Sequence, residues 1–167
     1  MEIEIVDAGE QDLQAIVAIY NQAVRETTAI WNFTEVDEAN RWHWLRERVD
    51  AGYPVLVARS GGHCLGYATY GPWRPHDGFA RTVEHSVYVA EGRQGNGIGS
   101  TLMKALMVRA ADQGIHVMVA GIDAGNPGSI RLHERLGFSE SGRLPQVGMK
   151  FGRWLDLVFM QYVFPAP

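Results

Sequence analysis

A glycine-rich segment, residues 94–100, has the residue types that most directly indicate chemistry in this sequence. It runs Gln-Gly-Asn-Gly-Ile-Gly-Ser between a predicted strand and a predicted helix. Glycines let backbone N–H groups approach a ligand closely, and the start of the following helix carries partial positive charge. The segment therefore predicts a phosphate-binding loop. It lacks the Gly-Lys-Ser/Thr of a Walker loop and, with Ser100 in place of a third glycine, the Rossmann fingerprint; taken alone, such a turn is more often merely structural.

Composition excludes several other chemistries. The chain has 15 Lys and Arg against 19 Asp and Glu, so we expect no nucleic-acid partner. Cys64 is the single cysteine, which excludes an internal disulfide and paired-cysteine zinc sites, and the six histidines show no metal-binding spacing, so no metal is expected. No apolar run approaches the roughly 20 residues of a membrane helix, and the first residues do not resemble a secretory signal. We therefore expect a cytoplasmic protein that does not bind membranes.

The elements that must position the glycine segment follow from hydrophobic periodicity and end signals. We expect one domain over 1–167, without repeats or linkers, in which strands and helices alternate as in an α/β protein with a mixed sheet. In strand 83–89, Val83, His85, Val87 and Val89 should face one way and Glu84 the other. Strands are predicted at 2–6, 54–59, 64–70, 83–89, 116–123 and 154–164. Two helices are predicted to open with the capping-box-like motifs Asp7-x-x-Glu10 and Thr34-x-x-Asp37. Two more are predicted between the glycine segment and Gly114, and between Asn126 and Gly137.

Several motifs together resemble one family. Residues 94–99 fit the pattern [QR]-x-x-G-x-[GA] at every defined position. With 73–75 (Trp-Arg-Pro), 82–89, 133–138 (His-Glu-Arg-Leu-Gly-Phe) and 150–154 (Lys-Phe-Gly-Arg-Trp), the chain resembles the GNAT superfamily of N-acetyltransferases, in its phosphinothricin/methionine sulfoximine acetyltransferase branch. The resemblance covers essentially the whole chain. It implies the GNAT fold, an α/β (α+β) arrangement with a central mixed, largely antiparallel sheet flanked by helices.

The resemblance also implies that acetyl-CoA is the cosubstrate. Strand residues before the loop would hold the pantetheine arm through their backbone, and loop amides would hold the diphosphate. Asn126 would bind the cofactor arm while capping its helix, although the cap alone would explain its presence. The implied cofactor-binding residues are Val87, Tyr88, Val89, Gln94, Gly95, Asn96, Gly97, Ile98, Gly99, Ser100 and Asn126.

Two side chains are candidates for the chemistry. Attack on a thioester needs a neutral amine, and in related enzymes a carboxylate at the position of Glu84 acts as general base, usually through water. The alternative for Glu84 is an ordinary strand glutamate paired with a cation. His133 stands where many GNAT enzymes place a tyrosine that protonates the departing thiolate. It could serve as that acid, bind the cofactor, or only pack against its neighbours.

The acceptor-binding candidates are Trp31, Phe33, Arg74, Glu84 and Lys150. A small amino acid carries a carboxylate that Arg74 could grip with two hydrogen bonds, with Lys150 nearby, while Trp31 and Phe33 would form an apolar wall. Alternatively, Arg74 is a solvated loop charge and Trp31 a core residue. Related proteins are homodimers, and the apolar terminal strand is compatible with burial against a second copy.

These residues point to an N-acetyltransferase that moves the acetyl group from acetyl-CoA to the nitrogen of a small amino-acid-like substrate. Methionine sulfoximine, phosphinothricin and similar L-amino acids are the leading acceptors. One alternative is a GNAT enzyme acting on aminoglycosides or protein N-termini. Aminoglycosides are cationic and would need an acidic pocket, which Arg74 and Lys150 do not provide. Another alternative, from a different class, is a non-catalytic acyl-CoA-binding module.

Overall fold

A seven-stranded sheet forms the centre of the computed structural model, which describes all residues 1–167. Its strand order is β1-β2-β3-β4-β5-β7-β6, and every neighbouring pair is antiparallel except β4 and β5. The expected mixed, largely antiparallel sheet is therefore confirmed. The strands are β1 (Glu4–Asp7), β2 (Val55–Ser60), β3 (His63–Pro72), β4 (Thr82–Val89), β5 (Val117–Asp123), β6 (Ser139–Lys150) and β7 (Arg153–Val163).

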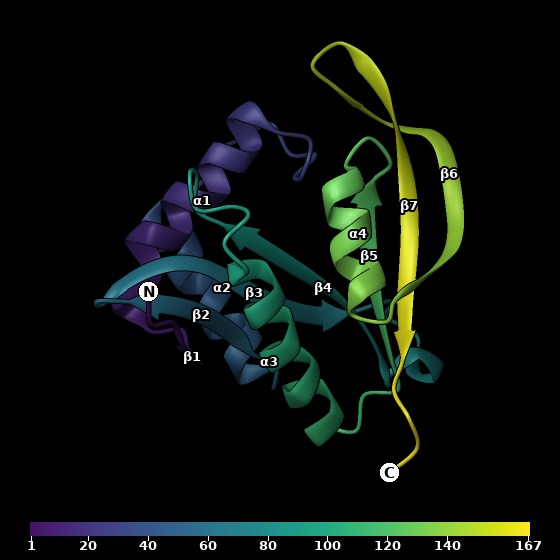
Figure 1. Ribbon diagram of the computed structural model, residues 1–167, viewed down its shortest axis with the longest axis horizontal. Helices are drawn as coiled ribbons and strands as arrows, with labels where there is room; N and C mark the ends of the chain where they lie inside the picture. The colour runs from purple at the N-terminus through teal and green to yellow at the C-terminus, as the bar shows by residue number, and fades with distance from the viewer.

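Two helices cover each face of this sheet (Figure 1). α3 (Ile98–Asp112) and α4 (Pro127–Arg135) pack on one face, where Leu102, Met103 and Leu106 lie at the centre of the largest apolar cluster. α1 (Leu13–Glu26) and α2 (Glu38–Asp50) pack on the other face through smaller clusters. No helix is long and apolar enough to cross a membrane. The sheet thus separates the α3/α4 layer from the α1/α2 layer. Residues from both layers can therefore line a site that lies between two strands.

Local end signals explain two of the helix starts. The Asp37 carboxylate accepts a hydrogen bond from the Asn40 amide at 2.8 Å, so Asp37 caps α2, which begins at Glu38. At the start of α4, the Asn126 side chain accepts from the Ser129 amide at 3.1 Å, with Pro127 at the first helical position. Both caps satisfy amides that have no partner within the helix. The sequence placed the start of α4 correctly, but it placed the cap of α2 three residues too early, at Thr34 instead of Asp37.

Two further predictions differ from the structure. Asp7 and Glu10 do not open the first helix, because Asp7 ends β1 and pairs with Arg109, and α1 begins at Leu13 after a short 3₁₀ turn (Glu10–Asp12). The long strand β6 was not predicted at all. It is mostly exposed, contains Pro145 and has no regular alternation of apolar and polar residues, and its pairing with β7 is irregular. The β6–β7 hairpin, drawn in yellow-green, extends beyond the other strand ends (Figure 1).

Candidate functional site

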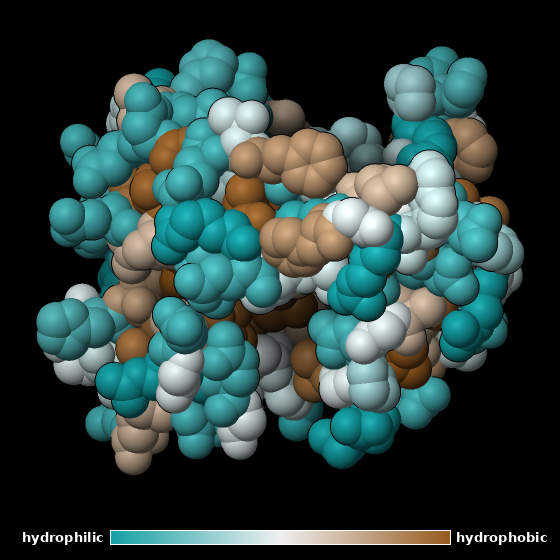
Figure 2. Space-filling view, turned by 90° about the horizontal axis from the view of Figure 1, so that it is seen from above, coloured by the Kyte–Doolittle hydropathy of each residue, from teal (hydrophilic) through white to brown (hydrophobic).

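The parallel strands β4 and β5 separate after a short paired stretch. They pair only at Thr82, Val83 and Glu84, whereas on its other side β4 stays paired with β3 as far as Val89. From His85 onward, the edge of β4 that faces β5 therefore has no strand partner. Unpaired backbone groups of this kind can bind an extended ligand as an added strand. The surface seen from this end is hollowed between the two halves of the molecule (Figure 2).

A large cavity of about 680 Å³ runs from this opening to the glycine segment. Gly97 adopts a left-handed conformation (φ 78°) and precedes the first residue of α3, so the amides at the start of α3 are free of helical partners. Arg93 and Arg135 add positive charge to the lining, a signal that the sequence analysis missed. The size of the cavity, its free backbone amides and its positive charge fit an elongated ligand that carries phosphate groups, as acetyl-CoA does.

The structure brings almost all of the predicted cofactor residues to this cavity. Asn96 does not line it, and its side chain instead donates to the Arg93 carbonyl at 3.1 Å within the turn. The Gln94 side chain donates to the Val89 carbonyl at 3.2 Å and so ties the loop to the end of β4. The predicted residues that line the cavity are Val87, Tyr88, Val89, Gln94, Gly95, Gly97, Ile98, Gly99, Ser100 and Asn126.

Glu84 lies where β4 and β5 part, since it is the last residue of β4 paired with β5. Gly121, two positions beyond its β5 partner, leaves room for the carboxylate: a Cβ at Gly121 would lie 3.3 Å from Glu84 Oε2. Burial raises the pKa of Glu84, and the positive charge of Arg74 opposes that rise. The carboxyl group is therefore a better base than an exposed glutamate. Arg74 and Glu84 do not form an ion pair.

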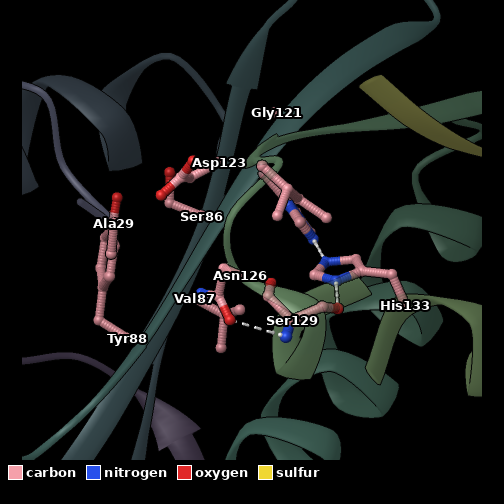
Figure 3. Close-up of a pocket in the computed structure, with 11 residues that line it drawn as sticks. Ala29, Ser86, Val87, Tyr88, Gly121, Asp123, Asn126, Ser129 and His133 are labelled. Carbon is pink, nitrogen blue, oxygen red and sulfur yellow. Dashed lines mark hydrogen bonds between the residues drawn. The ribbon is translucent and has the colours of Figure 1, made fainter. Parts of the chain in front are cut away.

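A smaller cavity of about 120 Å³ lies at the opening and contains a histidine pair on one wall. His85 Nε2 and His133 Nε2 are 2.9 Å apart, and His133 Nδ1 is 2.7 Å from the Ser129 carbonyl (Figure 3). Because a carbonyl only accepts, His133 Nδ1 must carry the proton, so its Nε2 accepts from His85. His85 Nδ1 is then left buried and without a partner. Both rings also contact Phe138.

Burial keeps both histidines neutral. It lowers the pKa of His85 to about 3, with a further contribution from His133, and it lowers the pKa of His133 as well. In this arrangement both nitrogens of His133 are already hydrogen-bonded inside the protein. The sequence did not single out His85, although its alternation with Val83 and Val87 correctly placed it on the face opposite Glu84.

The predicted acceptor-binding residues are more scattered. The Arg74 guanidinium is exposed and lies 3.8 Å from the centre of the Trp73 ring. Phe33 is 72% exposed and lines neither cavity. Lys150 is buried, with its ammonium group directed at backbone carbonyls in the last turn of α1 and in the segment that follows it. Trp31 lies against Gly148 of β6 rather than in either cavity.

Other residues of the smaller cavity were missed by the sequence analysis. Asp123 at the end of β5, Ser129 on α4 and Ala29 after α1 all line it (Figure 3). The Asp123 side chain is bonded by the Thr28 hydroxyl and by the Gly125 amide. Elsewhere, the structure has no group of three His, Cys, Asp or Glu side chains that could hold a metal ion.

Comparison with known proteins agrees with this geometry. A model described as acetyltransferase (GNAT) family matches residues 16–138. An L-methionine sulfoximine/L-methionine sulfone acetyltransferase of Pseudomonas aeruginosa is 60% identical over 162 residues, which is 96% of this chain and 94% of that protein.

Two solved structures are also similar. Ribosomal-protein-alanine N-acetyltransferase from Brucella melitensis has a TM-score of 0.95 and 54% identity, covering 96% of this chain and 99% of that one. A phosphinothricin acetyltransferase from Sinorhizobium meliloti, solved in complex with acetyl-CoA, has a TM-score of 0.94 and 35% identity, covering 98% and 89%. The family model matches more than half of the chain, and this chain therefore belongs to the acetyltransferase (GNAT) family.

Proposed function

We propose that this protein transfers the acetyl group of acetyl-CoA to the nitrogen of a small amino-acid-like substrate, such as methionine sulfoximine, phosphinothricin or a similar L-amino acid. The observation that carries the proposal is the large cavity, which joins the glycine segment to the unpaired edge of β4 from Val87 onward, three residues beyond Glu84. Glu84 itself lines neither cavity. The names of the similar methionine sulfoximine and phosphinothricin acetyltransferases support the choice of acceptor. Acetyl-CoA supplies the activated acetyl group.

In this proposal, binding of the cosubstrate is mainly a task of the backbone. The free edge of β4 at Val87, Tyr88 and Val89 would pair with the pantetheine arm, and the amides at the start of α3 would bind the diphosphate. Arg93 and Arg135 would screen the phosphate charges. In this arrangement the thioester would lie at the opening between β4 and β5.

Glu84 is the proposed general base. Its carboxylate would take a proton from the substrate ammonium group, directly or through a water molecule, so that a neutral amine attacks the thioester. Its raised pKa supports this role, because a base is more effective when its pKa approaches the working pH. Arg74, which acts on the same carboxylate electrostatically, is the proposed ligand of the acceptor carboxylate.

His133 is a less direct candidate for returning a proton to the leaving thiolate. Its Nδ1–H is bonded to the Ser129 carbonyl, and its Nε2 accepts from His85. Acting as the acid would require Nε2 to take up a proton and to exchange His85 for the sulfur atom. The packing role, which the sequence left open, needs no such rearrangement.

We further propose that the enzyme is a cytoplasmic homodimer. Support for a second copy comes from the β6–β7 hairpin, which exposes large apolar side chains that ordinarily would be covered. They are Leu144, Val147, Met149, Phe151 and Trp154. Size-exclusion chromatography with light scattering should give twice the chain mass for the wild type, and Trp154→Glu should shift it toward the monomer. A monomeric wild type would contradict the proposal.

The acceptor is tested with a panel of amines and a free-thiol readout. Methionine sulfoximine, phosphinothricin, methionine, an aminoglycoside and a peptide beginning with alanine should separate the alternatives, the last because of the similar ribosomal-protein-alanine enzyme. We expect turnover of the small amino acids. Turnover of the aminoglycoside or the peptide alone would overturn the proposed acceptor.

The role of Glu84 is tested with Glu84→Gln, which keeps the shape of the side chain and removes the base. We expect turnover to fall by roughly 10²- to 10⁴-fold, the usual contribution of a positioned base. Acetyl-CoA binding, followed by calorimetry, should be unchanged. An almost unchanged rate would show that Glu84 is not the base, and an inactive wild type that binds acetyl-CoA would favour a non-catalytic binding module.

A further inference from the structure

The segment that follows α1, residues 27–31, lies beside both cavities and is called the strap here. Thr27, Thr28 and Ala29 line the large cavity, and Ala29 also lines the smaller one at the opening between β4 and β5. None of the strap residues is charged. Its position therefore affects the site through shape and backbone groups.

Lys150, at the end of β6, holds the strap through its ammonium group. Nζ donates to the Thr27 carbonyl at 2.7 Å, to the Ile30 carbonyl, and more weakly to the Ala23 carbonyl at 3.5 Å. The residue is 2% exposed, and no carboxylate lies within ion-pair distance of it. An ammonium group has three N–H donors, so in this arrangement none remains for a substrate carboxylate.

Two further contacts fix the strap independently of this charge. The Trp31 ring lies on Gly148 of β6 so closely that a Cβ at Gly148 would be 2.4 Å from Cζ3, and the indole N–H donates to the Thr28 carbonyl at 2.8 Å. The Thr28 hydroxyl is bonded to the Asp123 carboxylate, which itself lines the smaller cavity. The strap is thus attached to β6 at two places and to β5 at one.

We propose that Lys150 is a positioning residue, which sets the acceptor site by holding the strap and does not contact the acceptor. The inference rests on the proposed acetyltransferase function. It replaces the expectation from the sequence that Lys150 binds the substrate directly. Small displacements of groups that orient a substrate can cost a large part of the rate. Loosening any of the three attachments should therefore weaken acceptor binding in the same way.

The test compares three variants, one for each attachment. Lys150→Met removes the donors and keeps an unbranched side chain, Gly148→Ala displaces the Trp31 ring, and Thr28→Val removes the hydroxyl. Gly142→Ala is the matched control, because it lies on the same strand and a Cβ there meets nothing within 4 Å. We expect the first two variants to raise the acceptor KM on the order of 10- to 100-fold, Thr28→Val to raise it less, and Gly142→Ala to leave it unchanged.

A second comparison separates positioning from direct binding. If Lys150 positions the strap, Lys150→Met should raise the KM of an amino-acid acceptor and of its uncharged amide by the same factor. If Lys150 binds the acceptor carboxylate, the loss should be confined to the acid. Confinement to the acid, or a wild-type KM in Gly148→Ala, would overturn the proposal.

Amide hydrogen exchange provides a readout that does not depend on turnover. Exchange of residues 27–31 should be faster in Lys150→Met and Gly148→Ala than in the wild type and in Gly142→Ala. Should Lys150→Met fail to fold, Gly148→Ala provides the same test. Unchanged amide exchange of residues 27–31 in Gly148→Ala would refute the proposal that contacts with β6 hold the strap. Failure of the proposed function is distinguishable, because it would appear as a wild type that acetylates no amine in the panel.

Discussion

Replacing His133 and His85 separately should affect stability very unequally, although the two side chains share one hydrogen bond. Both are buried, at 1% and 7% exposure, and His85 Nε2–H donates to His133 Nε2 at 2.9 Å. His85 Nδ1 already lacks a partner. His133→Leu would leave both nitrogens of His85 unpaired. Since an unpaired buried polar group costs about 1–3 kcal/mol, we expect the free energy of unfolding to fall by about that amount.

His85→Leu should cost much less. It leaves His133 Nε2 unpaired but removes the unpaired Nδ1 of His85, so the number of unpaired nitrogens in the pair stays the same. We expect a change below about 1 kcal/mol. The double variant, with both histidines replaced by leucine, leaves no imidazole nitrogen of this pair in the core. It should recover most of the free energy of unfolding that is lost in His133→Leu. Urea unfolding at neutral pH, with unchanged m-values, measures all three.

The same pair predicts how stability depends on pH. Burial lowers the folded-state pKa of His85 to about 3, below the value of about 6.5 for an unfolded histidine. The unfolded state then binds more protons below pH 6.5, so stability is complete above that pH and is lost as the pH falls toward 3. His85 changes the free energy of unfolding by at most about 1.4 kcal/mol per pH unit in this range.

The slope of the free energy of unfolding against pH provides a second assay. His85→Leu should flatten the loss of stability between about pH 6 and pH 4, as urea titrations at several pH values would show. Equal destabilisation by the two single variants would refute the assigned hydrogen bond. An unchanged slope in His85→Leu would refute the conclusion that this side chain is buried in its neutral form.

Three further outcomes follow from the structure. Arg74→Ala should raise the KM of carboxylate-bearing acceptors on the order of tenfold while the calorimetric affinity for acetyl-CoA holds, and equal losses on both sides would mean that the loop is only structural. Gly97→Ala should weaken acetyl-CoA binding about tenfold, because a residue with a Cβ pays roughly 1–2 kcal/mol to adopt the left-handed backbone conformation of Gly97. Gly92 has a similar φ of 76° but lies outside the cavity, so Gly92→Ala should bind acetyl-CoA like the wild type. Leu102→Ala, at a position with 0% exposure, should lower the free energy of unfolding by about 2–5 kcal/mol in urea, and a loss below 1 kcal/mol would contradict its central place in the core.

The features that the sequence determined are local ones. The glycine segment, the Asn126 cap and the opposite orientation of Glu84 and His85 each depend on residues within one turn or one strand. Hydrogen-bonding side chains, positive φ angles and strand alternation act over a few positions, so a single sequence suffices to place them. The resemblance to the GNAT superfamily added the role of these elements, because its motifs lie in the same local segments.

Tertiary structure alone decided which of these elements meet. Lys150 was expected to face a substrate, but it lies against the Ile30 carbonyl, 120 positions away in the chain. His85 pairs with His133 across 48 positions, and Trp31 rests on Gly148 of a strand that has no apolar alternation to reveal it. Periodicity specifies which face of an element is buried, whereas strand order and register determine what lies opposite that face. These contacts exist only because β5, β7 and β6 follow β4 in that order across the sheet.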